Sequence, residues 1–104
     1  MKSGTIVLTH GSIKGNYLHL SHVIDIFPSS AIGGPNESQR ATQLLEVHTG
    51  IGQPVLTDIA GDKQIFRKRG WVRDFFKTNN LKAGDCVIIE QTGEYRYLIY
   101  PQKR

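Results

Sequence analysis

Polar and apolar residues alternate over short stretches of this sequence, and turns rich in glycine, asparagine and proline separate the stretches. A period of two positions is typical of a half-buried β-strand. The pattern predicts seven strands, at residues 5–9, 17–21, 43–48, 54–58, 63–67, 86–90 and 95–100. We expect residues 5–9 and 17–21 to form a hairpin with Lys14 at its tip, and residues 63–67 to pair with residues 54–58.

Two stretches instead predict short helices. Residues 22–27 form an apolar segment that a proline ends, and residues 70–78 place Trp71, Phe75 and Phe76 on an amphipathic helix. We expect these aromatic side chains in the core rather than as stacking platforms for bases. Because no long helical crossover joins the strands, the predicted fold class is mainly β, a seven-stranded open β-barrel with two short α-helices.

The composition fits a single domain over residues 1–104 with a polyanionic partner. A chain of 104 residues is long enough for one core and too short for two. Its formal net charge is +4 and its pI is about 9.4. Residues 63–77 hold six lysines and arginines against one acidic residue, which predicts a basic patch rather than a uniform coat.

The position of this basic stretch favours phosphate binding. Arg67, Lys68 and Arg69 stand directly before the predicted helix, at the positive end of its dipole, where cations are disfavoured. An anionic partner relieves that repulsion, and helix starts beside lysine and arginine suit phosphates. The alternative is a solvated basic turn ahead of an ordinary core helix.

No group of residues has the spacing of a catalytic or metal site. The four histidines lack a helical i, i+4 pair and Cys86 has no partner cysteine, so we expect no metal, no cofactor and no disulfide. Asp58, Asp62 and Lys63 faintly resemble the metal-binding carboxylates and lysine of a nuclease, but no second strand supplies a further carboxylate. We therefore expect no catalytic residue in this domain.

The compartment is also predicted from composition. A lone cysteine fits a reducing cytoplasm. No apolar run reaches the length of a signal peptide or of a membrane span, so we expect a cytoplasmic protein with no membrane partner.

A longer motif supports the nucleic-acid interpretation. The run IFRKRGWVRDFFKTNNLKAGDCVII, residues 65–89, resembles the signature of the B-three type DNA-binding pseudobarrel. Residues 7–28 are similar to the opening of that family, and residues 44–64 to its middle strands, so the resemblance covers nearly the whole chain. The family includes plant transcription-factor domains and the DNA-recognition domains of bacterial type II restriction endonucleases. The short first arm of this chain is closer to the bacterial branch.

The resemblance implies a function and a set of site residues. It implies sequence-specific binding of double-stranded DNA by two arms in the major groove, with cleavage carried by a separate nuclease domain or subunit. It implies a base-reading N-arm made of His10, Ser12, Lys14 and Asn16. It implies a base-reading C-arm made of Asp58, Gly61, Asp62, Lys63 and Gln64. It implies phosphate contacts from Arg40, Arg67, Lys68, Arg69 and Lys82.

Three other interpretations are open at this point. A swapped-hairpin bacterial transcription regulator also carries Leu-Lys-x-Gly-Asp before an apolar strand, although such chains are shorter and dimeric. A small metal-dependent nuclease would use Asp58 and Asp62. A protein-interaction barrel would be indifferent to DNA, whatever the salt concentration.

Overall fold

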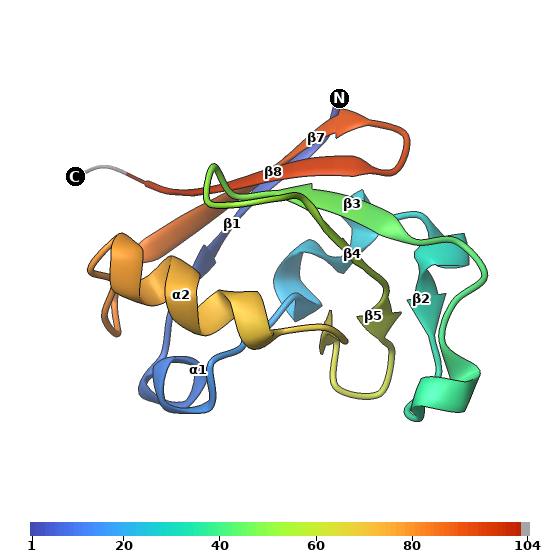
Figure 1. The fold of residues 1–104 in the computed structure, drawn as a ribbon, viewed down its shortest axis with the longest axis horizontal. Helices are drawn as coiled ribbons and strands as arrows, with labels where there is room; N and C mark the ends of the chain where they lie inside the picture. Colours follow the sequence, from blue (N-terminus) through green and yellow to red (C-terminus); the bar gives the residue numbers. More distant parts are fainter. Residues whose placement is uncertain (103–104) are drawn as a thin grey trace.

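The computed structural model describes residues 1–102, and this part of the chain is mainly β, with two sheets and two short α-helices (Figure 1). The strands are β1 (Ser3–Val7), β2 (Ile32–Gly33), β3 (Leu45–His48), β4 (Val55–Thr57), β5 (Ile59–Ala60), β6 (Ile65–Phe66), β7 (Cys86–Gly93) and β8 (Arg96–Pro101). The α-helices are α1 (His10–Gly15) and α2 (Gly70–Thr78). Three 3-10 helices span Ser21–Ile26, Ser29–Ala31 and Glu37–Gln39. No helix within residues 1–102 is long and apolar enough to cross a membrane.

The larger sheet joins both ends of the described chain. Its five strands follow the order β1-β7-β8-β3-β4, with β3 and β8 parallel and the other neighbours antiparallel. Alternation along β7 and β8 buries Val87, Ile89, Tyr97 and Ile99 on one face. Figure 1 shows both α-helices on the same side of this sheet.

The core lies between the sheets and the helices. Phe75 and Phe76 are buried as predicted, and Trp71 packs beside them with its ring 5.7 Å from that of Phe66. Tyr97 is fully buried, and its hydroxyl donates a hydrogen bond of 2.7 Å to the carbonyl of Ile26. Burial raises the pKa of Tyr97 to about 12. The aromatic residues of α2 therefore hold the fold together and are not free for stacking on bases.

The predicted hairpin with Lys14 at its tip is wrong, because residues 10–15 form α1. Thr9 caps this helix: its hydroxyl accepts a bond of 3.1 Å from the backbone of Ser12, and the Ser12 hydroxyl accepts one of 2.8 Å from the backbone of Thr9. This reciprocal capping box satisfies two backbone donors at the helix start. Of the predicted strand 17–21, a single bridge remains, between His19 and Ile65.

The predicted open barrel is not confirmed, because the strands form two sheets that meet at Asp58. The chain leaves the large sheet after Thr57 and enters a three-stranded sheet, ordered β2-β5-β6, at Ile59. β6 therefore pairs with β5, and not with residues 54–58 as expected. The mainly β class is confirmed, and α2 has the predicted bounds. The helix expected at residues 22–27 is a 3-10 helix over Ser21–Ile26, and Phe27 follows it in extended conformation. The described residues do not close into a barrel.

Candidate nucleic-acid interface

The turn between β5 and β6 forms the first side of the candidate site. Asp62 and Lys63 are exposed at its tip, and Gln64 closes it with a positive φ of 56° and an N–H bond of 2.7 Å to the Ala60 carbonyl. Position 61 requires a glycine for a structural reason, since a Cβ there would lie 2.6 Å from the carbonyl oxygen of Gly33. The turn thus presents two charged side chains on a fixed backbone.

Helix α1 and its C-terminal cap form the second side. His10 and Lys14 are exposed, and Asn16 ends the helix in the left-handed conformation with a φ of 55°. Ser12, predicted to read bases, is only 3% exposed, and its hydroxyl is engaged with Thr9. Ser12 is therefore a capping residue, and its removal from the predicted contact set is a correction.

Asp58 was also predicted to read bases, but its carboxylate is buried at the junction of the two sheets, with 2% of the residue exposed. It accepts hydrogen bonds from Nε and Nη2 of Arg67, at 2.7 and 3.0 Å, and from the backbone of Ala41 at 2.7 Å. Burial alone would raise the pKa of this carboxyl. The hydrogen bonds from Arg67 and Ala41, with the charge of Arg67, hold the Asp58 pKa below its ordinary value of 3.8.

Arg67, predicted to contact phosphate, is occupied inside the protein. Besides Asp58, its guanidinium donates to the carbonyls of Gly34 at 2.7 Å and Asn36 at 3.0 Å. The hydrogen bond to Asp58 raises the pKa of Arg67 further. We call Asp58 and Arg67 the seam pair. The pair ties the β4–β5 corner to residues 34–41, which gives it a structural role. The Asp58 carboxylate is too buried to read bases, whereas Arg67 also borders a hollow with Arg40 and Lys68, and its phosphate contact stays a prediction.

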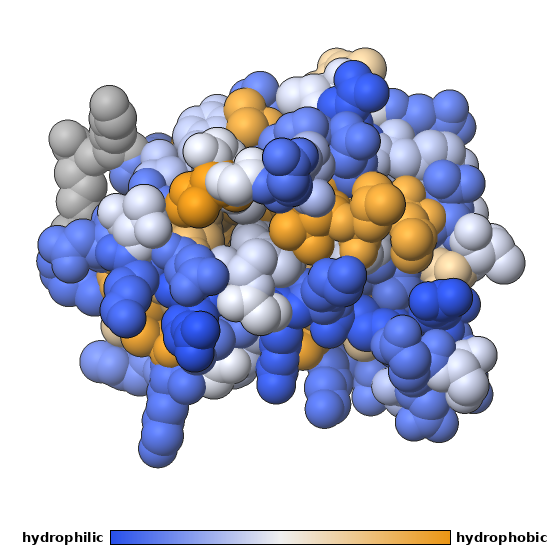
Figure 2. Space-filling view, in the orientation of Figure 1, coloured by the Kyte–Doolittle hydropathy of each residue, from blue (hydrophilic) through white to orange (hydrophobic). Residues whose placement is uncertain are grey.

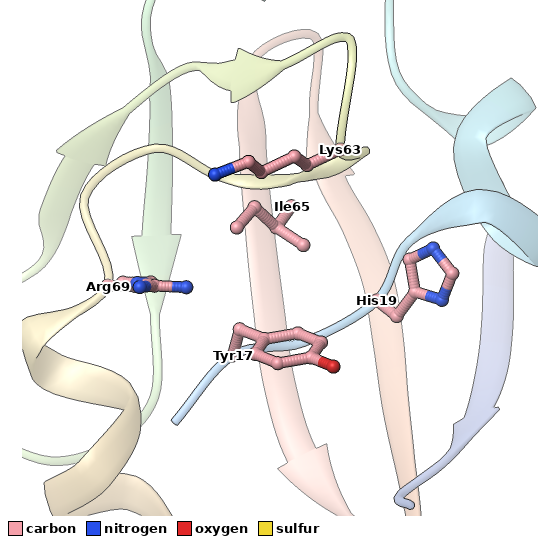
Figure 3. A pocket seen from close by; sticks show the side chains of 5 residues that line it. All are labelled: Tyr17, His19, Lys63, Ile65 and Arg69. Atoms are coloured by element: carbon pink, nitrogen blue, oxygen red, sulfur yellow. The ribbon is translucent and has the colours of Figure 1, made fainter. Parts of the chain in front are cut away.

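Arg69 has the opposite surroundings. Its side chain makes no hydrogen bond or ion pair with any other residue in the described part of the chain, and neither does that of Lys63. Both cations line a pocket of about 390 Å³ together with Tyr17, His19 and Ile65. Figure 3 shows Lys63 on the β5–β6 turn above Ile65, Tyr17 below it, and Arg69 entering from the segment before α2. We call this hollow the arm pocket.

A second hollow links Arg69 to α1. It is lined by Gly15, Asn16, Arg69, Gly70 and Arg73. Arg69 thus lies between the C-arm residue Lys63 and the N-arm residue Asn16, so the structure brings both predicted arms to one cationic surface. The Arg73 side chain is 70% exposed, and its Nε lies 3.9 Å from Oδ1 of Asp74.

Tyr17, His19 and Arg73 are site residues that were not expected from the sequence. The alternation in YLHLS could have indicated Tyr17 and His19. Leu18 and Leu20 are buried, so the side chains that alternate with them point outward. Arg73 belongs to the basic stretch 63–77 and is one helical turn from Arg69.

The remaining predicted phosphate contacts lie elsewhere. Arg40 and Lys68 border a separate hollow with Leu44 and Leu56, and Arg40 approaches Glu37 at 3.8 Å. Figure 2 shows an apolar patch over the β3–β4 region, where Leu44 and Leu56 are the exposed leucines, on a face that is otherwise mostly hydrophilic. Lys82 is exposed in the turn before β7. Within residues 1–102, no group of three or more His, Cys, Asp or Glu side chains is arranged to hold a metal.

The fold is similar to that of the N-terminal domain of Helicobacter pylori LlaJI.R1. The two structures agree with a TM-score of 0.60 over 99% of this chain and 88% of that domain, at 13% sequence identity. No protein-family model matches the sequence, and no curated protein matches it. At this identity the likeness concerns the fold.

Proposed function

We propose that this domain binds double-stranded DNA sequence-specifically through the major groove. The observation that carries the proposal is a pair of cations, Lys63 and Arg69, that have no partner among residues 1–102 and line a pocket between residues 17–19 and the β5–β6 turn. Inside a folded domain, exposed lysine and arginine without a carboxylate partner are available to phosphates and to guanine edges. The net charge of +4 supplies the attraction toward a polyanion.

In the proposed complex the two arms read base edges. His10, Lys14 and Asn16 act from the α1 side, and Asp62 with Lys63 acts from the turn. Lysine donates to guanine acceptors and aspartate accepts from the cytosine amino group, whereas asparagine pairs with adenine. Gln64 remains a predicted contact at the end of the turn. Gly61, which has no side chain, allows the backbone of the turn to lie close to Gly33.

Phosphate contacts come from cations around the arms. Arg73 lies on the first turns of α2, beside Arg69, and adds to the positive end of the helix dipole. Lys68, Arg40 and Lys82 are exposed and remain predicted phosphate contacts. Such contacts position the protein on the duplex and carry no sequence information.

The biological setting we infer is restriction in a bacterium. The structural neighbour comes from a restriction-system protein. We propose that this domain is the target-recognition part of such a system and that a separate domain or subunit cleaves the DNA. A nuclease site on this domain lacks support, because the Asp58 carboxylate is already engaged by Arg67. Magnesium-dependent cleavage by the purified domain, lost in Asp62→Ala, would contradict this assignment.

The direct test is selection of bound sites from a random duplex pool, followed by affinity measurements on the selected duplex at several salt concentrations. Contacts from four to six cations predict a log-log slope of roughly −4 to −5 for the association constant against salt. Enrichment of one sequence together with this slope would support the proposal. A flat salt response and no enrichment would contradict it and favour a protein-interaction role.

A further inference from the structure

The arm pocket contains more than cations. Tyr17 is half-buried with its ring beside the pocket, and Ile65, 8% exposed, forms the floor (Figure 3). A site that only holds phosphate has no use for an aromatic wall and an aliphatic floor. The major-groove edges of the bases carry hydrogen-bonding groups and a single kind of apolar group, the C5 methyl of a pyrimidine. The apolar lining therefore has one natural counterpart in the groove.

The apolar walls are held in place before any DNA arrives. The Tyr17 ring lies against α1 at Gly15, where a Cβ would be only 2.8 Å from the ring, and the Tyr17 N–H donates to the Ser12 carbonyl at 3.1 Å. On the other side, Leu20 donates to the carbonyl of Gln64 at 2.8 Å. These bonds fix the segment that carries Tyr17 against β6, so the pocket keeps its shape without the cost of ordering on binding.

Arg69 adds a donor at the edge of the same pocket. Its guanidinium has no partner within residues 1–102 and points into the hollow between Lys63 and Tyr17 (Figure 3). A free guanidinium in the major groove pairs bidentately with O6 and N7 of guanine. An apolar contact and a guanine reader thus stand side by side.

We propose that the arm pocket recognises a C5-methylated pyrimidine next to a guanine, with Tyr17 and Ile65 contacting the methyl and Arg69 donating to the guanine. This inference rests on the proposed duplex binding and names what the pocket reads. Thymine and 5-methylcytosine both present this methyl, and the experiment separates them.

The experiment uses the duplex selected from a random pool. Each thymine is replaced in turn by deoxyuridine, which removes the methyl and keeps the pairing, and each cytosine is replaced in turn by 5-methylcytosine. At one position next to a guanine, loss of the methyl is expected to weaken binding about fourfold, the value of one buried methyl. If the source is 5-methylcytosine, methylation at one position strengthens binding by a similar factor.

Variants assign the effect to the pocket. In Tyr17→Ala the difference in affinity between the methylated and unmethylated duplexes is expected to shrink to less than about twofold. Tyr100→Ala is the matched control, since Tyr100 lies on the outward face of the large sheet and bonds Glu90; it retains the full difference. If Tyr17→Ala does not fold, Ile65→Val, which removes one methyl from the floor, takes its place.

The outcomes separate this inference from the proposed function. If no duplex is bound at all, both fail. If a selected duplex is bound and discriminated, but no methyl replacement changes its affinity, the pocket does not read a methyl and only this inference fails. An increase on binding in the fluorescence of 2-aminopurine, placed next to the sensitive pyrimidine on the side away from the guanine, would mean that the pyrimidine leaves the stack, and would also overturn it.

Discussion

Arg67 and Arg69 stand two residues apart in the same basic run, yet their surroundings in the folded chain are opposite. Arg67 continues the pairing of β6, with its N–H donating to the Asp58 carbonyl at 2.9 Å, and its guanidinium is turned inward onto the Asp58 carboxylate. Arg69 occupies the N-cap position of α2, with φ −135° and ψ 8°, and its guanidinium faces the arm pocket. A change of backbone conformation after β6 separates the two roles.

This difference shows that a count of basic residues overstates the charge available to a ligand. The seam pair is neutral as a unit and lies at the junction of the two sheets, whereas the two cations of the arm pocket have no ion-pair partner among residues 1–102. The same residue type therefore stabilises the fold at position 67 and is available for binding at position 69. Variants that affect stability and affinity separately test this contrast.

The largest expected effect is on stability. Arg67→Ala leaves the Asp58 carboxylate buried without its charge partner and is expected to reduce the free energy of unfolding by about 3–5 kcal/mol. Arg69→Ala is expected to change it by less than about 0.5 kcal/mol, as for an exposed side chain without partners. Urea unfolding of both variants measures this. Equal stability of the two variants would remove the distinction between the seam pair and the arm pocket.

The next effect is on affinity. Arg69→Ala and Lys63→Ala are each expected to cost about 1–3 kcal/mol of binding to the selected duplex and to relax discrimination at one or two base pairs. Lys14→Ala is expected to act in the same way from the other arm. Affinities for the selected duplex and for single-substitution duplexes provide the measurement. A uniform loss across all sequences would show that these residues contact phosphate and not bases.

A smaller effect concerns salt. Arg73→Ala is expected to reduce the log-log salt slope by about one, because one phosphate contact is lost. Replacing the seam pair together, Arg67→Met with Asp58→Asn, is expected to leave the slope unchanged, since both charges disappear and neither faces DNA. Circular dichroism first establishes that the double variant is folded. A reduced slope in that variant would place Arg67 on the DNA.

The smallest expected effect is on the pH dependence of stability. The pKa of Asp58 is lowered in the folded state, so its contribution is fully present above the ordinary value of 3.8 and is lost as pH falls through the lower, folded value. Acid unfolding of the wild type is therefore expected to include a component below about pH 4 that Asp58→Asn lacks. Urea midpoints measured between neutral and acidic pH test this, and parallel curves for the two proteins would contradict it.

The parts of the fold that the sequence predicted well have strong local patterns. α2 was predicted with correct bounds because the spacing of its aromatic residues indicates a helix and the asparagines that follow mark its C-terminal end. The β7–β8 hairpin follows from alternation around a glycine turn. Helix α1 was missed because HGSIKG contains two glycines, which are weak helix formers, and its stability depends on the capping box and on Tyr17 packing against Gly15.

The site was predicted in part for a similar reason. Lys63 and Asn16 were expected on two different arms. Lys63 lines one hollow and Asn16 another, and Arg69 lines both hollows. The burial of Asp58 was not visible in the sequence, because a charged residue beside a polar turn reads as exposed unless its partner is known. That partner, Arg67, lies across the β5–β6 turn and bonds carbonyls of residues 34 and 36, which are remote in the chain.

The pairing of β1 with β7 has a consequence for how the protein is made. Ser3 aligns with Glu90 and Val7 with Cys86, so β1 has no partner until most of the domain that follows it has been synthesised. Until then the apolar side chains of Ile6 and Leu8, buried in the finished fold, remain open to other nascent chains. Such long-range pairing is slow to form. Lowering the temperature to slow synthesis is therefore expected to raise the yield of folded protein less than a chaperone that covers β1 until β7 emerges.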